Sequence, residues 1–125
     1  MIFLRRSEIL ALHRRLIEEF GGAPGVLNEG ALESAVVAPE NRRWYEEADI
    51  VACAAAYAWH FTQAHAFVDG NKRVGAAAME VFLIANGARV EASDDALSKL
   101  IMRIASGDLD RDGTERWLRR RVRSD

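Results

Sequence analysis

The sequence contains a single cysteine, which excludes a disulfide framework and a cysteine-based metal cluster. Cys53 lies inside an apolar run, so we interpret it as a small core residue. No stretch is long and apolar enough to span a bilayer. The start, Met1 to Arg6, is too short for the apolar part of a signal peptide, and its charges follow the apolar residues instead of preceding them. These absences predict a soluble cytoplasmic protein that does not enter a membrane.

A strong excess of charge is also missing, since 17 lysines and arginines stand against 19 acidic residues and the net charge is −2. A nucleic-acid binder should carry a basic excess, so we expect no direct contact with nucleic acid. Cations at a helix C-terminus favourably oppose the helix dipole. We therefore interpret the basic cluster near the end as a solvated helix end, with partner docking as the alternative. The cluster comprises Arg116, Arg119, Arg120, Arg121 and Arg123.

Several familiar catalytic and metal-binding patterns do not occur. The sequence has no Walker A loop, no Gly-x-Ser-x-Gly elbow and no His-Glu-x-x-His pattern. Asp108 begins a segment that resembles a calcium-binding loop, but Arg119 occupies the twelfth position, where a bidentate glutamate is needed. His60 and His65 are five residues apart, which is not the one-face spacing of a helical metal pair. Neither calcium nor zinc is therefore expected.

Apolar residues recur at three- and four-residue spacing along much of the chain, which favours an all-α fold. The length suits one domain with a buried core, and we expect a single domain over residues 1–125. We predict a bundle of about six helices. They run from Ser7 to Phe20, from Ala31 to Val37 before Pro39, from Ala48 to Phe61, from about Asn71 to Ala85, from Ser93 or Asp94 to Gly107, and over a last segment with Trp117, Leu118 and Val122.

The alanine-rich segment from Ala48 to Phe61 is apolar on all sides, which predicts a helix at the centre of the bundle. Small residues from Gly75 to Ala78 should let the next helix approach it closely. Asn41 to Glu47 is polar, and we interpret it as a loop whose two aromatic residues, Trp44 and Tyr45, pack onto the body.

Local signals at the helix ends and in the links complete this expectation. Ser7 should cap the first helix, and Asp112 to Glu115 should form a capping box for the last one. We interpret Ala88 to Ala92 as a short extended link. His13 falls on the apolar side of the first helix, where we interpret it as a hydrogen-bonded structural histidine.

The nine residues from His65 to Arg73 combine an imidazole, a carboxylate, a carboxamide and two cations between two long apolar segments. This mixture is not a core pattern, so we interpret the stretch as a loop that opens a helix near Asn71, and we call it the motif loop. A helix start presents free N–H groups and partial positive charge, which suits an anion. Lys72 adds a full charge, while His65 has the chemistry of a general base and Asp69 that of a magnesium ligand. The pattern predicts a catalytic loop that handles phosphate.

The motif loop resembles the signature of the Fic/Doc superfamily, His-x-Phe-x-Asp-Gly-Asn-x-Arg, in which a loop joins two central helices of a helical bundle. The lysine before the arginine makes it similar to the Doc, or death-on-curing, branch. Gly25 to Ala35, Phe82-Leu83, Asn86-Gly87 and Trp117-Leu118 also resemble family segments, so the resemblance covers nearly the whole chain.

The resemblance implies that His65, Asp69 and Lys72 are catalytic. His65 would take the proton from a target hydroxyl, and Asp69 would bind Mg²⁺. Lys72 would hold phosphates of ATP, which is the substrate.

The remaining residues of the motif loop would bind or support. Gly70 and Asn71 would shape an anion hole and contact phosphate, and Arg73 would hold phosphates together with Lys72. Phe67 would anchor the loop in the core. The resemblance also implies a flap that aligns the target, for which Met1 to Leu4 and Arg42 to Glu47 are candidates.

Position 72 separates two reactions within this superfamily. Typical Fic enzymes have a glycine there and transfer AMP, whereas the lysine of the Doc branch goes with a reversed nucleotide whose terminal phosphoryl group is transferred. Ala76 stands where typical Fic motifs have a second arginine. Both departures favour a protein kinase over the alternative, a Fic-type adenylyltransferase. A non-catalytic helical module that only binds a partner is a third reading, which the intact motif loop disfavours.

Proteins similar to Doc are toxins of toxin-antitoxin modules that phosphorylate a threonine of elongation factor Tu and halt translation. The resemblance therefore implies this target class and a cognate antitoxin. Fic proteins with an internal brake carry a Ser/Thr-x-x-x-Glu-Gly or Asn motif, but Gly25 precedes Glu29-Gly30 here at the Ser/Thr position. Inhibition is therefore expected from a separate antitoxin, as a helix in an apolar groove.

Overall fold

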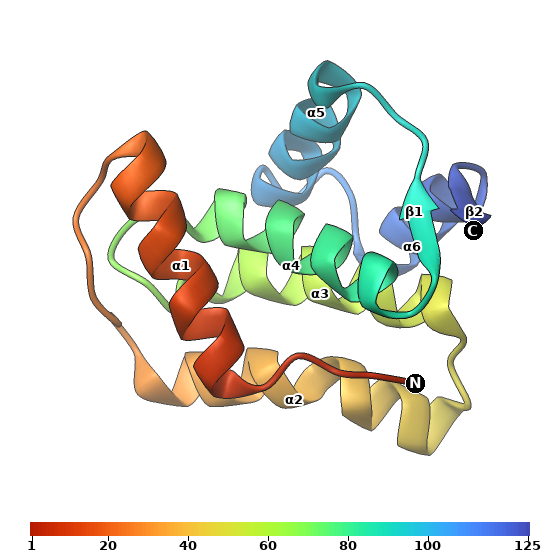
Figure 1. Cartoon of the computed structure of the whole chain (residues 1–125), viewed down its shortest axis with the longest axis horizontal. Helices are drawn as coiled ribbons and strands as arrows, with labels where there is room; N and C mark the ends of the chain where they lie inside the picture. Colours follow the sequence, from red (N-terminus) through yellow and green to blue (C-terminus); the bar gives the residue numbers. More distant parts are fainter.

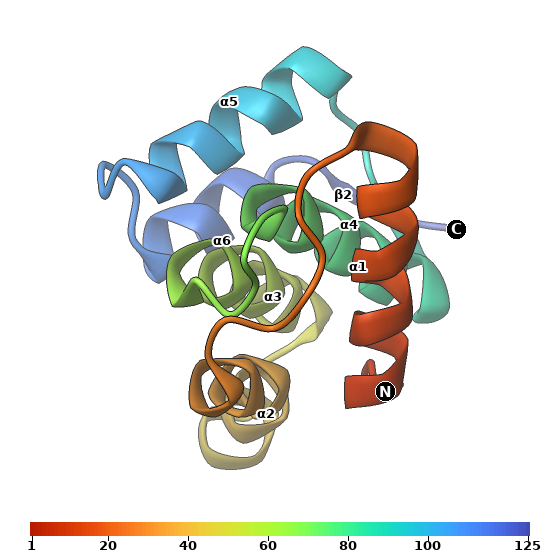
Figure 2. The ribbon, with the colours of Figure 1, turned by 90° about the vertical axis from the view of Figure 1, so that its left-hand side faces the viewer.

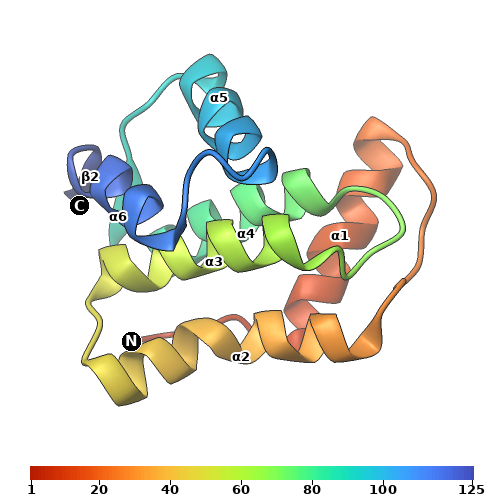
Figure 3. The ribbon, with the colours of Figure 1, turned by 180° about the vertical axis from the view of Figure 1, so that it is seen from behind.

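Helix α3 (Ile50–Ala64) runs through the middle of the structure, and four of the other helices contact it (Figures 1 and 3). The computed structural model describes all residues from 1 to 125. The other elements are α1 (Arg6–Phe20), α2 (Glu29–Glu46), α4 (Asn71–Ala85), β1 (Ala88–Val90), α5 (Asp94–Ala105), α6 (Arg111–Arg119) and β2 (Val122–Ser124). The predicted all-α class with about six helices is confirmed.

The helices are arranged in layers around the pair formed by α3 and α4. Figure 2 looks nearly along this pair and shows α2 on one side of it and α5 on the other. Helix α1 packs against α4 and the start of α2. None of the helices has both the length and the apolar character needed to cross a membrane.

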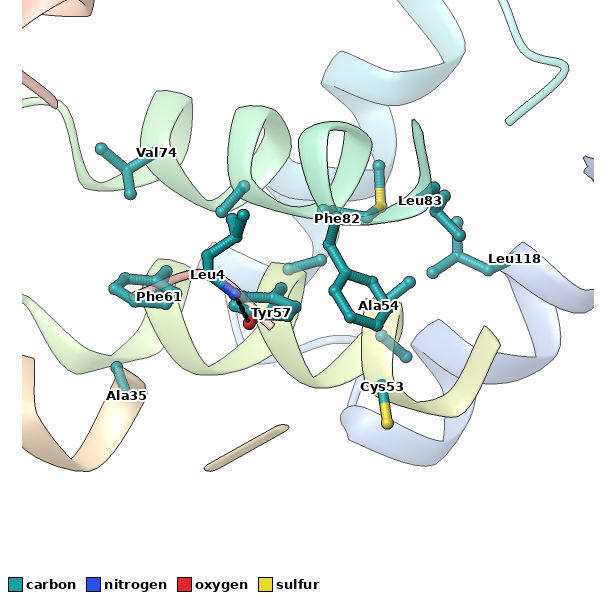
Figure 4. Close-up of a cluster of buried hydrophobic side chains, with 14 of the residues drawn as sticks. Leu4, Ala35, Cys53, Ala54, Tyr57, Phe61, Val74, Phe82, Leu83 and Leu118 are labelled. Carbon is teal, nitrogen blue, oxygen red and sulfur yellow. Dashed lines mark hydrogen bonds between the residues drawn. The ribbon is translucent and has the colours of Figure 1, made fainter. Parts of the chain in front are cut away.

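The core is built on α3, as its composition predicted. Every residue from Ala52 to Ala58 is buried, including Cys53. Tyr57 packs against Phe82 of α4 with 4.9 Å between ring centroids, and its hydroxyl accepts a hydrogen bond from the Leu4 N–H at 2.8 Å (Figure 4). The helix begins after the Asp49 cap and ends at Ala64, three residues beyond the predicted end.

Helix α4 has the predicted bounds and lies close against α3. Gly75 makes this approach possible, because a Cβ atom there would overlap Thr62 Oγ1 and lie 3.0 Å from the Ala58 carbonyl oxygen. The close packing of small residues is thus confirmed, and it places the first turn of α4 beside the last turn of α3.

Helix α2 contradicts the predicted stop at Pro39 and the predicted loop from Asn41 to Glu47. It continues through the proline to Glu46 because a stripe of residues packs against its neighbours on both sides of Pro39. Trp44 and Tyr45 do not pack onto the body, since their exposed fractions are 80% and 78%. The buried stripe consists of Leu32, Ala35, Pro39 and Arg42.

The predicted N-caps of α1 and α6 were also wrong. The N-cap of α1 is Arg5, whose N–H donates to the Glu8 carboxylate at 3.0 Å, and not Ser7. The N-cap of α6 is Asp110, whose carboxylate accepts from the Gly113 N–H at 2.7 Å, so Asp112 lies inside the helix.

The predicted extended link after α4 forms a strand. Ala88 to Val90 pairs antiparallel with β2, in which Val122 lies, so Val122 is not part of the last helix. The cap of α5 is Ser93, one of the two predicted residues, and its hydroxyl accepts from the Ala96 N–H.

Candidate functional site

The motif loop joins the C-terminus of α3 to the N-terminus of α4, as predicted (Figure 3). His65 is the C-cap of α3 and has a left-handed backbone with φ of 49°. Gly70 is the N-cap of α4 and has φ of 83°, a conformation that glycine adopts without strain. These two turns aim the chain out of α3 and back into α4, so the functional residues lie at one end of the helix pair.

The motif loop is held from within by Phe67 and Asn71. Phe67 is buried, and its ring stacks on the His13 ring of α1 at 3.8 Å between centroids. The Asn71 side chain accepts from the Phe67 N–H at 3.0 Å and donates to the Phe67 carbonyl at 2.9 Å. Because the side-chain oxygen and nitrogen of Asn71 both bind the backbone of the loop, Asn71 shapes the loop. His13 is the predicted hydrogen-bonded structural histidine, since its Nε2 lies 2.8 Å from the Asp69 carbonyl oxygen.

The connector between α1 and α2, residues 21–28, also supports the motif loop. Its Val26 forms an isolated antiparallel bridge with Phe67. The Val68 N–H donates to the Gly25 carbonyl at 3.1 Å, and the Ala23 N–H donates to the Asp69 carboxylate at 2.7 Å. The sequence shows this connector only as rich in turn residues, because its partners are more than thirty-five positions away.

Neither segment proposed as a flap lies beside the motif loop. The Ile2 N–H donates to the Asn86 side chain at the C-terminal end of α4, whereas the loop precedes the N-terminal end. Arg42 to Glu47 belongs to the last turns of α2, where Arg42 donates to the Ala52 carbonyl in the first turn of α3. Both flap candidates were wrong, and the segment that borders the loop is the connector.

A cavity of about 630 Å³ opens beside the motif loop. It brings together six of the seven predicted site residues, while Phe67 stays in the core beneath them. The α1 end, the connector, α3 and the end of α5 complete its wall. The cavity is lined by Phe20, Gly21, Gly22, Thr62, His65, Asp69, Gly70, Asn71, Lys72, Arg73 and Ala105.

The cavity is electropositive on the side of α4. Lys72 and Arg73 make no ion pair within the protein. The Arg73 guanidinium lies over the Phe20 ring and donates to the Gly21 carbonyl at 3.3 Å, which orients it. The first N–H groups of α4 have no acceptor within the helix. Two uncompensated cations and a helix N-terminus together form a site for an anion such as a phosphate group.

The two remaining polar groups have room to act on a bound molecule. The His65 side chain is exposed and makes no hydrogen bond within the protein, so its imidazole is free to accept a proton. One Asp69 oxygen accepts from Ala23, and the other has no partner in the chain. No three side chains of the metal-binding types gather anywhere in the structure. A magnesium ion would thus rely on one carboxylate together with water and phosphate oxygens, which is common for this ion.

A second hollow of about 530 Å³ continues from the cavity between α4 and α5. Its walls include Lys72 and Arg73, and its apolar surface comes from Ala76, Leu97 and Ile101 among others. We call it the α4–α5 groove. Glu80 and Asp94 also line it, and burial together with the charge of Asp94 raises the pKa of Glu80.

In this helical bundle the motif loop places an imidazole, a carboxylate and two cations at the N-terminus of a core helix, an arrangement that is suited to binding phosphate. Residues 3–83 match the Fic/DOC family, and the chain belongs to this family. It is also similar to the protein kinase Doc of Escherichia phage P1, with 32% identity over 115 residues. That alignment covers 91% of this chain and 90% of the phage protein.

Proposed function

We propose that this chain is a protein kinase of the Doc type, which transfers the terminal phosphoryl group of ATP to a serine or threonine hydroxyl of a protein. Membership of the Fic/DOC family and similarity to a phage protein kinase support this reading. The observation that carries it is Lys72, which lines the cavity where Fic enzymes have a glycine. Its side chain occupies space that an adenylyl-transferring enzyme keeps open, and it adds charge for a terminal phosphate.

Each residue of the cavity has a different role in the proposed phosphoryl transfer. His65 takes the proton from the attacking hydroxyl, for which its exposed and unbonded imidazole is suited. Lys72 and Arg73 bind the phosphates and stabilise the charge that spreads over the transferring group. The backbone N–H groups of Gly70 and Asn71 add neutral donors to the same group. Asp69 would hold Mg²⁺, which supplies further charge neutralisation at the phosphate oxygens when bound.

We propose further that the kinase is a toxin that halts translation in the cytoplasm by modifying a translation factor, with elongation factor Tu as the first target to test. A cognate antitoxin would restrain it through a helix laid in the α4–α5 groove, which has an apolar surface and adjoins Lys72. An internal brake is not supported, because Glu29 pairs with Arg6 at 2.6 Å at the start of α2.

The test is intact-protein mass spectrometry of purified elongation factor Tu after incubation with the chain, Mg²⁺ and ATP. The expected result is a gain of one phosphoryl group with the wild type and none with His65→Ala. A gain of one adenylyl group would instead establish AMP transfer and refute the argument from Lys72. The variant must still bind the antitoxin, which shows that its inactivity is chemical and not a failure to fold.

Two further outcomes separate the target from the chemistry. If elongation factor Tu stays unmodified but another translation factor gains a phosphoryl group, the kinase reading stands and the proposed target is wrong. If no protein is modified and His65→Ala is as toxic to cells as the wild type, the chain acts by binding alone.

A further inference from the structure

His13 of α1 contacts the motif loop at two points, although it lies more than fifty positions earlier in the chain. Its ring stacks on Phe67 at an interplanar angle of 11°. Its Nε2 lies 2.8 Å from the carbonyl oxygen of Asp69. A carbonyl oxygen can only accept, so Nε2 carries the proton and donates it. His13 is only 4% exposed, which keeps water from competing for this bond.

The Asp69 carbonyl belongs to the same peptide unit as the Gly70 N–H. A peptide unit is planar and trans, so its C=O and N–H point in opposite directions. When His13 holds the carbonyl toward α1, the N–H of Gly70 is therefore turned away from α1. This N–H has no acceptor within the protein, and Gly70 lines the cavity beside Lys72. The direction of one anion-binding donor thus depends on a hydrogen bond made on the opposite side of the loop.

His13 also limits the alternative positions of this peptide. A Cβ atom at Gly70 would lie 3.5 Å from both Cδ2 and Nε2 of His13, so the ring packs directly under the N-cap of α4. The Ala23 N–H holds the Asp69 side chain separately, at 2.7 Å. Backbone and side chain of Asp69 are thus fixed by different partners, and only the backbone depends on His13.

We infer that His13 is a positioning residue that orients the Gly70 N–H toward a bound phosphate by holding the carbonyl of the same peptide. This goes beyond a structural histidine, because it predicts a loss of anion binding that a merely destabilised control variant does not show. The inference rests on the proposed function only for its effect on the rate of phosphoryl transfer. Its effect on anion binding is independent of the reaction.

The test compares three variants. His13→Phe keeps a planar ring against Phe67 but removes the donor. His13→Gln keeps an N–H donor of similar reach but removes the ring. Leu10→Ala is the matched control. Leu10 and His13 both line a separate hollow of about 410 Å³ between α1 and the connector, and Leu10 makes no hydrogen bond to Asp69. Pyrophosphate is titrated into each protein while the amide signal of Gly70 is followed by NMR, and thermal unfolding is recorded in parallel.

We expect His13→Phe to weaken pyrophosphate binding about tenfold and to abolish the binding shift of the Gly70 amide. His13→Gln should recover most of the affinity, and Leu10→Ala should bind like the wild type even if it unfolds at a lower temperature. In the transfer assay, His13→Phe should lower kcat by about tenfold to a hundredfold, since small misplacements of this kind are costly. Equal affinity and equal Gly70 shifts in His13→Phe and Leu10→Ala would overturn the inference.

The wild type alone provides a check that does not depend on a variant folding. The His13 Nε2 proton should be protected from solvent exchange, and its signal should move when pyrophosphate binds, because donor and anion share one peptide unit. A ring proton that exchanges freely, or does not respond, would also overturn the inference. If the wild type transfers no phosphoryl group but these binding results hold, the proposed function fails and the role of His13 stands.

Discussion

Replacing Gly75 by alanine tests the contact that sets α4 against α3. In an exposed helix this change stabilises by about 1 kcal/mol, because alanine is the better helix former. Here the added Cβ would overlap Thr62 Oγ1 and lie 3.0 Å from the backbone oxygen of Ala58, which cannot move without bending α3. Overpacking of this kind costs about 1 to 3 kcal/mol. We therefore expect a net decrease of about 1 kcal/mol in the free energy of unfolding.

Urea denaturation followed by circular dichroism measures this change, and a melting temperature lower by roughly 4 °C should accompany it. The matched control is Thr62→Ala, which removes a buried hydroxyl without a hydrogen-bond partner and should be nearly neutral. In the double variant the overlap with Oγ1 is gone but the contact with the Ala58 oxygen remains, so part of the lost stability should return, with a coupling energy of about 0.5 kcal/mol. An increase in stability for Gly75→Ala alone would refute the close approach of the two helices.

Three further predictions concern buried or half-buried groups outside the site. Burial lowers the pKa of His60 from 6.5 to about 4, so the unfolded chain binds a proton at His60 more readily than the folded protein does. The free energy of unfolding should therefore fall as the pH drops from 6.5 to 4, and urea denaturation of His60→Gln should show a shallower fall. Burial raises the pKa of Cys53 to about 11, so a thiol reagent should label it only as fast as the protein unfolds, and immediate labelling would contradict this. Arg42→Ala leaves the Ala52 carbonyl and Glu115 without their buried donor, so the free energy of unfolding, measured by urea denaturation, should fall by about 3 kcal/mol. A fall below about 1 kcal/mol would show that Arg42 and Glu115 behave like a surface ion pair.

The elements that were predicted well are those whose structure is set by neighbouring residues in the sequence. Helix α4 has both bounds as predicted, because Gly70 precedes its first turn, Asn86-Gly87 follows its last turn, and its alanines favour a helix. The centre of α3 was equally clear, since a run of alanines with few β-branched residues favours a helix wherever it is buried. The motif loop likewise identified six of the residues that line the cavity, whereas the lining residues of α1, the connector, α3 and α5 come from distant segments.

The second half of helix α2, from Pro39 to Glu46, was missed because the local effect of a proline opposes the packing of the helix against its neighbours. Pro39 lacks the N–H that a helix interior needs, which predicts an end at that point. In the structure Pro39 is itself buried, in line with Leu32 before it and Arg42 after it. This three- and four-residue spacing continues across the proline and was the signal that could have extended the helix. Packing against α3 outweighs the lost hydrogen bond.

The sequence by itself determined the fold class, the central helix and the identity of the motif loop, because helix propensity, apolar spacing and a contiguous motif are properties of neighbouring residues. Only the tertiary structure decided that the connector of residues 21–28, and not the predicted flap segments, borders the loop. It also decided that His13 reaches the Asp69 carbonyl. These contacts join positions about forty to fifty-six apart, and hydrogen bonds to a backbone group leave no residue pattern, since every residue carries the same carbonyl and N–H.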